Sequence, residues 1–214
     1  MTLHIVWDWN GTLLDDLHVV IEAVNLSMSV LGFDPIDEQG YRDHFTRPIR
    51  AFYDSLLGRA VAEDEWELLN QGFHDQYLTL MPTAELAPDA KQALSLAKER
   101  GFGQSLLSMS PQSHLESVVA STGIAHYFGR IDGLSGTTGG VKARHLEVHL
   151  SALAVAPNRA VVIGDTPDDA AAARHVGASV VLYDGGSHHL PVLEEVGVPL
   201  AHTLVEAVEL AATT

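Results

Sequence analysis

Two short runs of the sequence place carboxylates directly after an apolar stretch, among small and hydroxyl-bearing residues. The first is Asp8-Trp9-Asn10-Gly11-Thr12-Leu13, which follows the apolar residues 3–7. The second is Gly164-Asp165-Thr166-Pro167-Asp168-Asp169, which follows the apolar residues 160–163. An Asp at the mouth of a tight, glycine-containing turn can act as a nucleophile or as a metal ligand, or it can merely cap the turn.

Asp8, Asp165 and Asp169 meet if the two apolar runs are parallel strands whose carboxyl ends share one edge of a sheet. Ligand sites in open α/β sheets lie at that edge. Crowded carboxylates repel one another, and a hard cation such as Mg²⁺ relieves the repulsion. The spacing therefore predicts a Mg²⁺ site. Asp168 is expected to be a solvated acid that favours the dipole of the following helix.

The elements that would position these residues alternate between strands and helices from residue 88 onward. Strands are expected at residues 3–7, 103–107, 130–134, 160–163 and 179–183. Helices are expected at 88–100, from Pro111, from Lys142 to about 153, from a Thr166 N-cap with Pro167 as first residue, and at 204–210. A glycine-rich loop at 133–140 precedes Lys142. This alternation predicts an α/β protein with a Rossmann-like, doubly wound parallel sheet.

Residues 15–83 show helical spacing of apolar side chains and no strand signal between them. Helices are expected at 15–31, after Pro48 as far as Gly58, and at 62–80. Because this block follows the first strand directly, it is expected to form an inserted helical lid. The predicted organisation is an α/β core of residues 1–14 and 84–214, with an all-helical cap domain of residues 15–83.

Composition excludes several classes of function. The net charge of −16 argues against nucleic acid or anionic membranes as partners, and the absence of cysteine excludes disulfides and thiol chemistry. No run is long enough to cross a bilayer or resembles a signal peptide, so a cytoplasmic protein is expected. A monomer or homodimer with a small-molecule substrate is expected. His188 and His189, in a Gly-Gly-Ser loop, are expected to be exposed.

The two acidic motifs resemble the first and last motifs of the haloacid dehalogenase (HAD) superfamily. Most of its members are Mg²⁺-dependent phosphatases that work through an aspartyl-phosphate. The helical block resembles the cap that many members carry between the first and second motifs. Residues 44–50, His44-Phe45-Thr46-Arg47-Pro48-Ile49-Arg50, resemble phosphoglycolate-phosphatase-like members. The resemblance covers nearly the whole chain.

The resemblance implies a role for each matching residue. Asp8 is the expected nucleophile, and Ser108 is expected to hold a phosphoryl oxygen through its hydroxyl. Lys142 is expected to bridge Asp8 and the transferring group. Asp165 is expected to bind the metal directly, whereas Asp169 acts through water or orients Lys142.

Further residues are expected to contact the substrate. Gly11 and Thr12 would offer backbone amides to phosphoryl oxygens, and Met109 lies beside Ser108 in the same expected phosphoryl site. Arg47, with Arg50, would hold a substrate carboxylate or second phosphate, because arginine pairs bidentately with such groups. Surface arginines are common, so the alternative that both are merely exposed stays open.

Asn10 departs from the superfamily pattern. The residue at this position is usually a second Asp that protonates the leaving oxygen and later activates water. An amide cannot carry that proton, and such acid–base help contributes about 10²–10⁴-fold. The backbone carbonyl of Asn10 can still bind the metal. The loss could be compensated by a good leaving group, by a cap residue such as His44, or by deamidation of Asn10.

The residues and the resemblance together favour a Mg²⁺-dependent phosphatase that hydrolyses a small organic phosphate monoester through Asp8. One alternative is a phosphate- or metabolite-binding protein whose turnover is impaired by Asn10. A second alternative is a dehalogenase-type hydrolase, which attacks carbon without a metal and usually carries an aromatic residue at the position of Asn10. The acidic ligand set argues against this second alternative.

Overall fold

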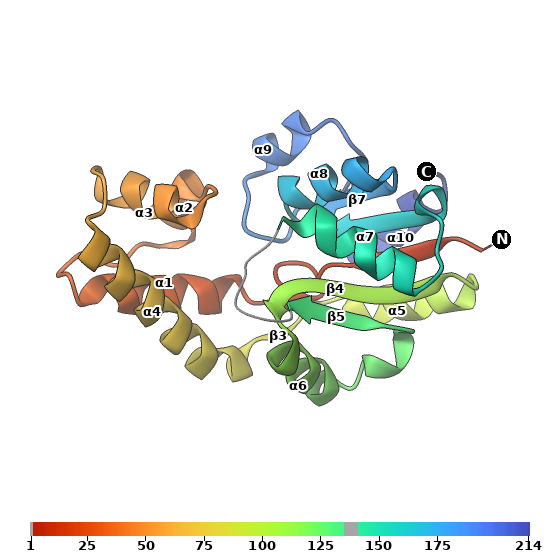
Figure 1. Cartoon of the computed structure of the whole chain (residues 1–214), viewed down its shortest axis with the longest axis horizontal. Helices are drawn as coiled ribbons and strands as arrows, with labels where there is room; N and C mark the ends of the chain where they lie inside the picture. Colours follow the sequence, from red (N-terminus) through yellow and green to blue (C-terminus); the bar gives the residue numbers. More distant parts are fainter. Residues whose placement is uncertain (1, 135–140) are drawn as a thin grey trace. The chain divides into compact units, whose positions relative to one another are not determined.

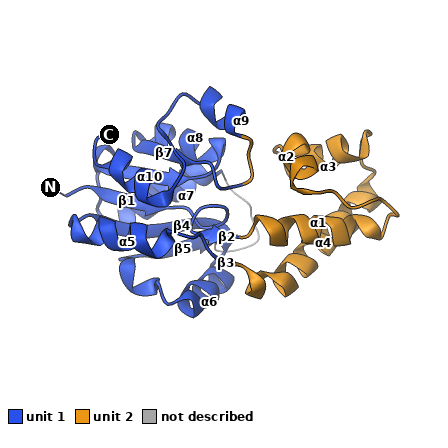
Figure 2. Cartoon of the chain, turned by 180° about the vertical axis from the view of Figure 1, so that it is seen from behind, with its two compact units in different colours: residues 1–15, 85–186, 190–214 blue, residues 16–84, 187–189 orange. Residues whose placement is uncertain are grey.

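A computed structural model describes residues 2–134 and 141–214 and divides the chain into two compact units (Figure 2). An α/β unit contains residues 1–15, 85–186 and 190–214, and a helical unit contains residues 16–84 and 187–189. The predicted division placed the boundaries after residues 14 and 83. The predicted glycine-rich loop at 133–140 lies outside the described residues from 135 onward.

The α/β unit is built on a six-stranded parallel sheet with the order β5-β4-β1-β6-β7-β8. Its strands are β1 (His4–Trp7), β4 (Gly103–Pro111), β5 (Ile131–Leu134), β6 (Ala160–Gly164), β7 (Ser179–Tyr183) and β8 (Leu200–Ala201). All residues of the central strand β1 are buried, as its apolar sequence predicts. Two further short strands, β2 (Leu14–Asp15) and β3 (Glu85–Leu86), pair antiparallel where the chain leaves and re-enters this unit.

Helices cover both faces of the sheet (Figure 1). The helices α7 and α8 contact each other on one face, and α5 and α10 contact each other on the opposite face. The helices of this unit are α5 (Ala90–Glu99), α6 (Gln112–Thr122), α7 (Lys142–Ala152), α8 (Pro167–Val176), α9 (Leu190–Glu195) and α10 (Leu204–Ala211). Short 3₁₀ turns occur at Ala125–Tyr127 and Pro157–Arg159. The predicted doubly wound sheet is thereby confirmed.

The helical unit contains α1 (Leu17–Ser29), α2 (Glu38–His44), α3 (Ile49–Leu57) and α4 (Glu63–Leu80), followed by a 3₁₀ turn at Met81–Thr83. The long helices α1 and α4 pack against each other. Their apolar faces and aromatic residues from α2 and α3 form a core separate from that of the sheet. No helix in the described part of the chain is long and apolar enough to cross a membrane.

Local corrections concern element boundaries. The strand β4 continues through Pro111, so the helix predicted to open at Pro111 begins at Gln112. Pro88 was predicted as the first residue of a helix, but α5 begins at Ala90 after Asp89. The helix α2, the helix α9 and the two-residue strand β8 were not predicted. Each is short, and its sequence carries little periodicity.

The loop that contains His188 and His189 was predicted to be exposed, and the structure contradicts that prediction. It belongs to the helical unit, where the His188 ring lies 4.9 Å from the Phe45 ring, centroid to centroid. Arg42 donates a hydrogen bond to the His188 carbonyl at 2.8 Å, and His189 Nε2 lies 2.9 Å from an oxygen of Asp43. The prediction failed because it considered only the polar neighbours of these residues in sequence.

Candidate active site

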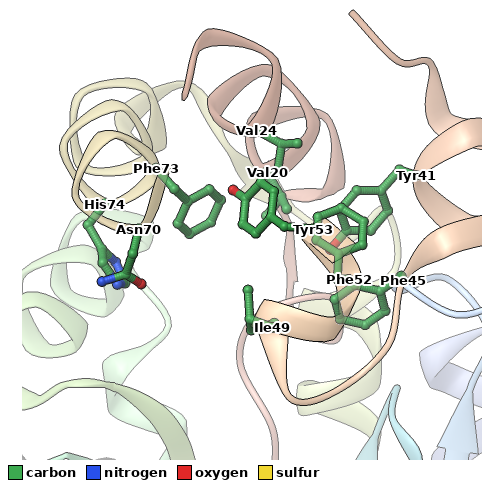
Figure 3. A pocket seen from close by; sticks show the side chains of 10 residues that line it. All are labelled: Val20, Val24, Tyr41, Phe45, Ile49, Phe52, Tyr53, Asn70, Phe73 and His74. Atoms are coloured by element: carbon green, nitrogen blue, oxygen red, sulfur yellow. The ribbon is translucent and has the colours of Figure 1, made fainter. Parts of the chain in front are cut away.

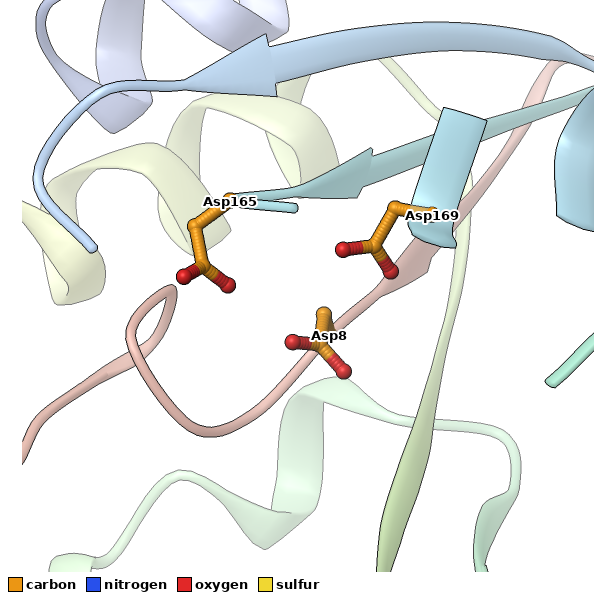
Figure 4. A group of neighbouring side chains, drawn as sticks. All are labelled: Asp8, Asp165 and Asp169. Atoms are coloured by element: carbon orange, nitrogen blue, oxygen red, sulfur yellow. The ribbon is translucent and has the colours of Figure 1, made fainter. Parts of the chain in front are cut away.

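The carboxylates of Asp8 and Asp165 meet because β1 and β6 are adjacent parallel strands. Trp7 pairs with Ile163 in the register, and the Asp8 amide donates a hydrogen bond to the Ile163 carbonyl at 2.8 Å. Both Asp residues follow directly at the carboxyl ends of their strands. Asp169 faces them from α8 (Figure 4). One carboxylate oxygen from each of these three buried residues lies within 4.8 Å of the others.

The first turn of α8 fixes Asp169. Thr166 is the N-cap and Pro167 the first helical residue, as predicted from the sequence. Asp169 Oδ2 accepts hydrogen bonds from the Thr166 hydroxyl at 2.6 Å and from the Thr166 amide at 3.0 Å. This capping box turns the other oxygen, Oδ1, toward Lys142. Asp168 is exposed in the same turn, as expected.

Lys142 is the first residue of α7 and connects two of the carboxylates. Its Nζ lies 2.5 Å from Asp8 Oδ1 and 2.5 Å from Asp169 Oδ1. The side chain of Lys142 is only 10% exposed, so these pairs are poorly screened by solvent. The arrangement matches the expectation that Asp169 orients Lys142 beside the candidate nucleophile.

Burial and nearby charges shift the pKa values of Asp8 and Lys142. Burial raises the pKa of Asp8 to about 6, while the nearby Lys142 cation opposes that rise and Asp169 adds to it. Burial alone would lower the pKa of Lys142, but the charges of Asp169 and Asp8 outweigh it and raise that pKa above the ordinary lysine value. Lys142 is therefore protonated near neutral pH. Its single positive charge contacts two of the three clustered carboxylates.

Asp165 is held in a close-fitting cradle. The Thr12 hydroxyl donates to Asp165 Oδ1 at 3.1 Å. A Cβ atom added to Gly11 would lie 2.5 Å from Asp165 Oδ2, and one added to Gly186 would lie 1.9 Å from the same atom. Backbone without side chains is thus required on both sides of this carboxylate. Gly186 was not predicted, although the glycine pair after the strand β7 is a sequence signal that could have indicated it.

Asn10 lies against two serines at the end of β4. Its Oδ1 accepts a hydrogen bond from the Ser110 hydroxyl at 2.8 Å and a long one from the Ser108 hydroxyl at 3.5 Å. The Ser110 amide donates to the Ser108 hydroxyl oxygen at 3.1 Å. The structure therefore brings Ser108 to the site as predicted, and adds Ser110, which the sequence analysis did not include.

Three predicted contact residues, Gly11, Thr12 and Met109, also lie in the α/β unit. The amides of Gly11 and Thr12 donate to the carbonyls of Leu14 and Trp9, at 3.0 and 3.2 Å, and their contact with a phosphoryl group stays a prediction. The tight turn uses these donors for its own closure. Met109 is half-buried between the two serines.

The cap residues that were predicted to act on the substrate all lie in the helical unit. Arg47 is exposed there, Arg50 donates to Glu63 at 2.7 Å, and His44 is bonded to Ser55 at 2.7 Å. Contacts of these residues with substrate stay predictions.

A third serine on β4, Ser105, has the neighbours of a catalytic serine but lies in the interior. Ser105, also on β4, is fully buried and lies between His4 Nε2 at 2.8 Å and His149 Nε2 at 2.7 Å. His149 Nδ1 in turn lies 2.7 Å from Asp132. The order Asp–His–Ser is that of a nucleophilic triad, but the serine and His149 have no exposed surface for a substrate. This group is a buried polar network.

A family model for haloacid dehalogenase-like hydrolases matches residues 2–177, which include Asp8, Ser108, Lys142, Asp165 and Asp169. The chain belongs to this family. The resemblance predicted from the two acidic motifs is thereby confirmed, and the protein is a HAD-like hydrolase.

Comparisons with individual proteins agree with this assignment. The HAD-like hydrolase is 26% identical to the phosphoglycolate phosphatase of Synechococcus elongatus over 184 residues, covering 85% of this chain and 84% of the relative. It is 26% identical to the phosphoglycolate phosphatase of Vibrio parahaemolyticus, covering 98% and 96% of the two chains. A haloacid dehalogenase-like hydrolase from Streptococcus pneumoniae has the same fold, with a TM-score of 0.84, 22% identity and coverage of 100% and 99%.

Proposed function

We propose that this HAD-like hydrolase removes phosphate from a small organic phosphate monoester, with Asp8 as nucleophile and Mg²⁺ as cofactor. The observation that carries the proposal is the placement of Asp8: its carboxylate lies at a strand end, 2.5 Å from Lys142 and beside Asp165 and Asp169. A dianionic phosphoryl group can be approached by a carboxylate only where positive charge offsets both, and Lys142 together with a bound cation would supply that charge.

The donor set fits a hard divalent cation. Three buried carboxylates offer oxygen atoms within 4.8 Å of one another, and Lys142 alone does not offset them. Asp8 and Asp165 would bind Mg²⁺ directly, with the backbone carbonyl of Asn10, while Asp169 contributes through Lys142. When bound there, Mg²⁺ would offset negative charge on the phosphoryl group and on the attacking carboxylate.

The residues of the chain divide the reaction into two displacements. In the first, an oxygen of Asp8 attacks phosphorus, the bond from phosphorus to the substrate alcohol breaks, and the alcohol oxygen leaves with the bonding electrons. Lys142 stabilises the charge on the transferring group, and the Ser108 hydroxyl donates to one of its oxygens. In the second, water attacks the phosphorus of the aspartyl-phosphate, which releases inorganic phosphate and restores the Asp8 carboxylate.

Asn10 is expected to limit the rates of both displacements. Its amide cannot give a proton to the leaving oxygen or take one from the attacking water. The first displacement then depends on how stable the leaving alkoxide is, and the second on unassisted water. We expect a slow phosphatase that prefers esters of acidic alcohols. The names of the curated relatives suggest phosphoglycolate as the first small ester to examine.

The proposal is tested by measuring phosphate release from a panel of phosphate esters with Mg²⁺ and then with excess EDTA. Turnover that EDTA stops and added Mg²⁺ restores supports the proposed cofactor. Turnover that is unchanged in EDTA contradicts the proposed cofactor, because the reaction would then proceed without Mg²⁺.

A second candidate function is phosphate or metabolite binding without turnover. The hydrogen bonds from Ser110 and Ser108 to Asn10 favour it, because they hold an amide where the reaction needs an acid and base. Saturable binding of a phosphate ester, without product over many hours, would distinguish this function from the enzyme.

A further inference from the structure

The helical unit contains a cavity of about 100 Å³ that is separate from the carboxylate cluster (Figure 3). All of its walls belong to the helical unit, from α1, α2, α3 and α4 and the residue that follows α2. Half of its lining is aromatic, namely Tyr41, Phe45, Phe52, Tyr53 and Phe73. A cavity with such walls favours a flat apolar ring, which can pack edge-to-face or offset against its neighbours.

The aromatic walls support one another without a ligand. The Tyr41 and Phe45 rings stack with centroids 5.1 Å apart, and the Phe45 and Phe52 rings meet edge-on at 5.9 Å. The Tyr53 ring lies 5.2 Å from Phe52, and its hydroxyl lies 3.4 Å from the Ser27 hydroxyl. These contacts hold the rings in place, so a ligand would meet a preformed site and would lose little free energy in ordering it.

One edge of the cavity is polar. Asn70 and His74 lie one turn apart on α4, and Figure 3 shows their side chains together at that edge. Within the described residues, neither side chain has a hydrogen-bond partner. Asn70 is half-buried and His74 is exposed, so the cavity reaches the surface here. An apolar pocket with a few convergent polar groups is the usual form of a small-molecule site.

The charges of the helical unit do not favour an anion in this cavity. Arg50 donates to Glu63 at 2.7 Å and to the Val61 carbonyl at 2.9 Å. Arg59 pairs with Glu65 through two hydrogen bonds of 2.7 Å. No arginine or lysine is among the residues that line the cavity, so a bound carboxylate or phosphate would have no such cation in the cavity wall.

We infer that this cavity is a binding site for a small, uncharged aromatic molecule of the size and polarity of phenol. Its ring would lie between the aromatic walls, and its hydroxyl would bond to Asn70 and His74. An apolar cavity of about 150 Å³ is sufficient to hold benzene. The cavity of the helical unit, at about 100 Å³, is about a third smaller, but it opens at its polar edge, so a ring can lie inside while its substituent remains near solvent. The inference does not rest on the proposed hydrolysis, because no residue of the carboxylate cluster takes part.

The test is a titration of the ¹⁵N-labelled 214-residue chain with phenol, followed by amide chemical shifts. We expect saturable binding with a dissociation constant of about 1 mM or tighter, and shifts confined to the helical unit, in α1, α2, α3 and α4. Benzoate, which has the same ring and a negative charge, should bind at least about tenfold more weakly. The titration requires neither Mg²⁺ nor phosphate, so its failure and a failure of the proposed hydrolysis are distinguishable.

Matched variants test the polar edge. Asn70→Ala should weaken phenol binding about threefold to tenfold, because one hydrogen bond is lost. Gln71→Ala changes the next residue of α4, whose amide points to Asp75, and should have no effect. If Asn70→Ala does not fold, His74→Ala at its exposed position provides the same comparison. Linear, non-saturating shifts, shifts in the α/β unit, or equal effects of Asn70→Ala and Gln71→Ala would overturn the inference.

Discussion

The side-chain oxygen of Asn10 accepts a hydrogen bond from the Ser110 hydroxyl at 2.8 Å. The Ser108 hydroxyl points to the same oxygen at 3.5 Å. A carboxylate has the same shape as this amide and could accept both hydrogen bonds in the same place. These two hydrogen bonds are therefore compatible with the Asp that most family phosphatases carry at this position.

Asn10→Asp should therefore raise turnover by about 10²-fold for esters of poorly acidic alcohols, because it restores a proton donor and acceptor. The gain should be much smaller for p-nitrophenyl phosphate, whose leaving group needs no proton. Steady-state kinetics across a series of leaving-group acidities measures the difference. The same gain for all esters would contradict a missing general acid.

Lys142→Met should lower turnover by about 10²–10³-fold, because the cation that stabilises the transferring group is lost. It also leaves Asp8 and Asp169 facing each other in a buried site, and removal of one partner from a buried ion pair costs about 3–5 kcal/mol of stability. Added Mg²⁺ should recover part of that stability. Turnover and thermal unfolding with and without Mg²⁺ measure both effects. Lys91→Met, at an exposed position on α5, is the control, and equal effects would contradict the role of Lys142.

Gly186→Ala should weaken Mg²⁺ binding by about tenfold or more, because the added methyl group would lie 1.9 Å from Asp165 Oδ2 and displace that carboxylate. Isothermal titration of the protein with Mg²⁺ measures the affinity. Gly129→Ala is a suitable control, since its Cβ would meet a carbonyl at an ordinary 3.7 Å. Unchanged Mg²⁺ affinity in Gly186→Ala would show that Asp165 is not a ligand.

One proton order is consistent with every contact of the buried network around Ser105. Asp132 accepts from His149 Nδ1, His149 Nε2 accepts from the Ser105 hydroxyl, and Ser105 accepts from His4 Nε2. This order requires His149 to be neutral, because its Nε2 accepts a hydrogen bond. Burial accordingly lowers the pKa of His4 to about 4, with His149 adding to the effect, and burial also lowers the pKa of His149.

Stability should therefore fall as the pH falls from about 6.5 to about 4. In this window the unfolded chain binds a proton on His4 that the folded protein does not, so protons favour unfolding. Above pH 6.5 the contribution is constant. His4→Gln should remove about 1–3 kcal/mol of this pH dependence. Urea unfolding at a series of pH values measures it, with His126→Gln as the exposed control. An unchanged slope in His4→Gln would contradict a neutral, buried His4.

The parts of the site that could be predicted from sequence are those that local structure determines. Asp8 and Asp165 each end an apolar strand, and parallel pairing then brings them to one edge of the sheet. Thr166 and Pro167 start a helix whose third residue is Asp169. These signals lie within a few residues of the atoms that they position, and spacing alone was sufficient to find them.

The parts that were missed depend on contacts between distant segments. Gly186 reaches Asp165 only because β7 pairs beside β6, and Ser110 reaches Asn10 only because β4 continues past Ser108. The amides of Gly11 and Thr12 close their own turn, which composition does not reveal. Lys142 was placed by the resemblance, since its position in sequence carries no geometric signal. The cavity in the helical unit likewise follows from packing among four helices.

The most direct measurement is phosphate release by the native protein and by Asp8→Asn, in Mg²⁺, from phosphoglycolate and p-nitrophenyl phosphate. Asp168→Asn, an exposed acid in the same protein, serves as the control for loss of one carboxylate. We predict that the native protein and Asp168→Asn release phosphate from at least one ester and that Asp8→Asn releases none. Full activity in Asp8→Asn would contradict the nucleophile, and no activity in the native protein and in Asn10→Asp would contradict phosphate ester hydrolysis itself.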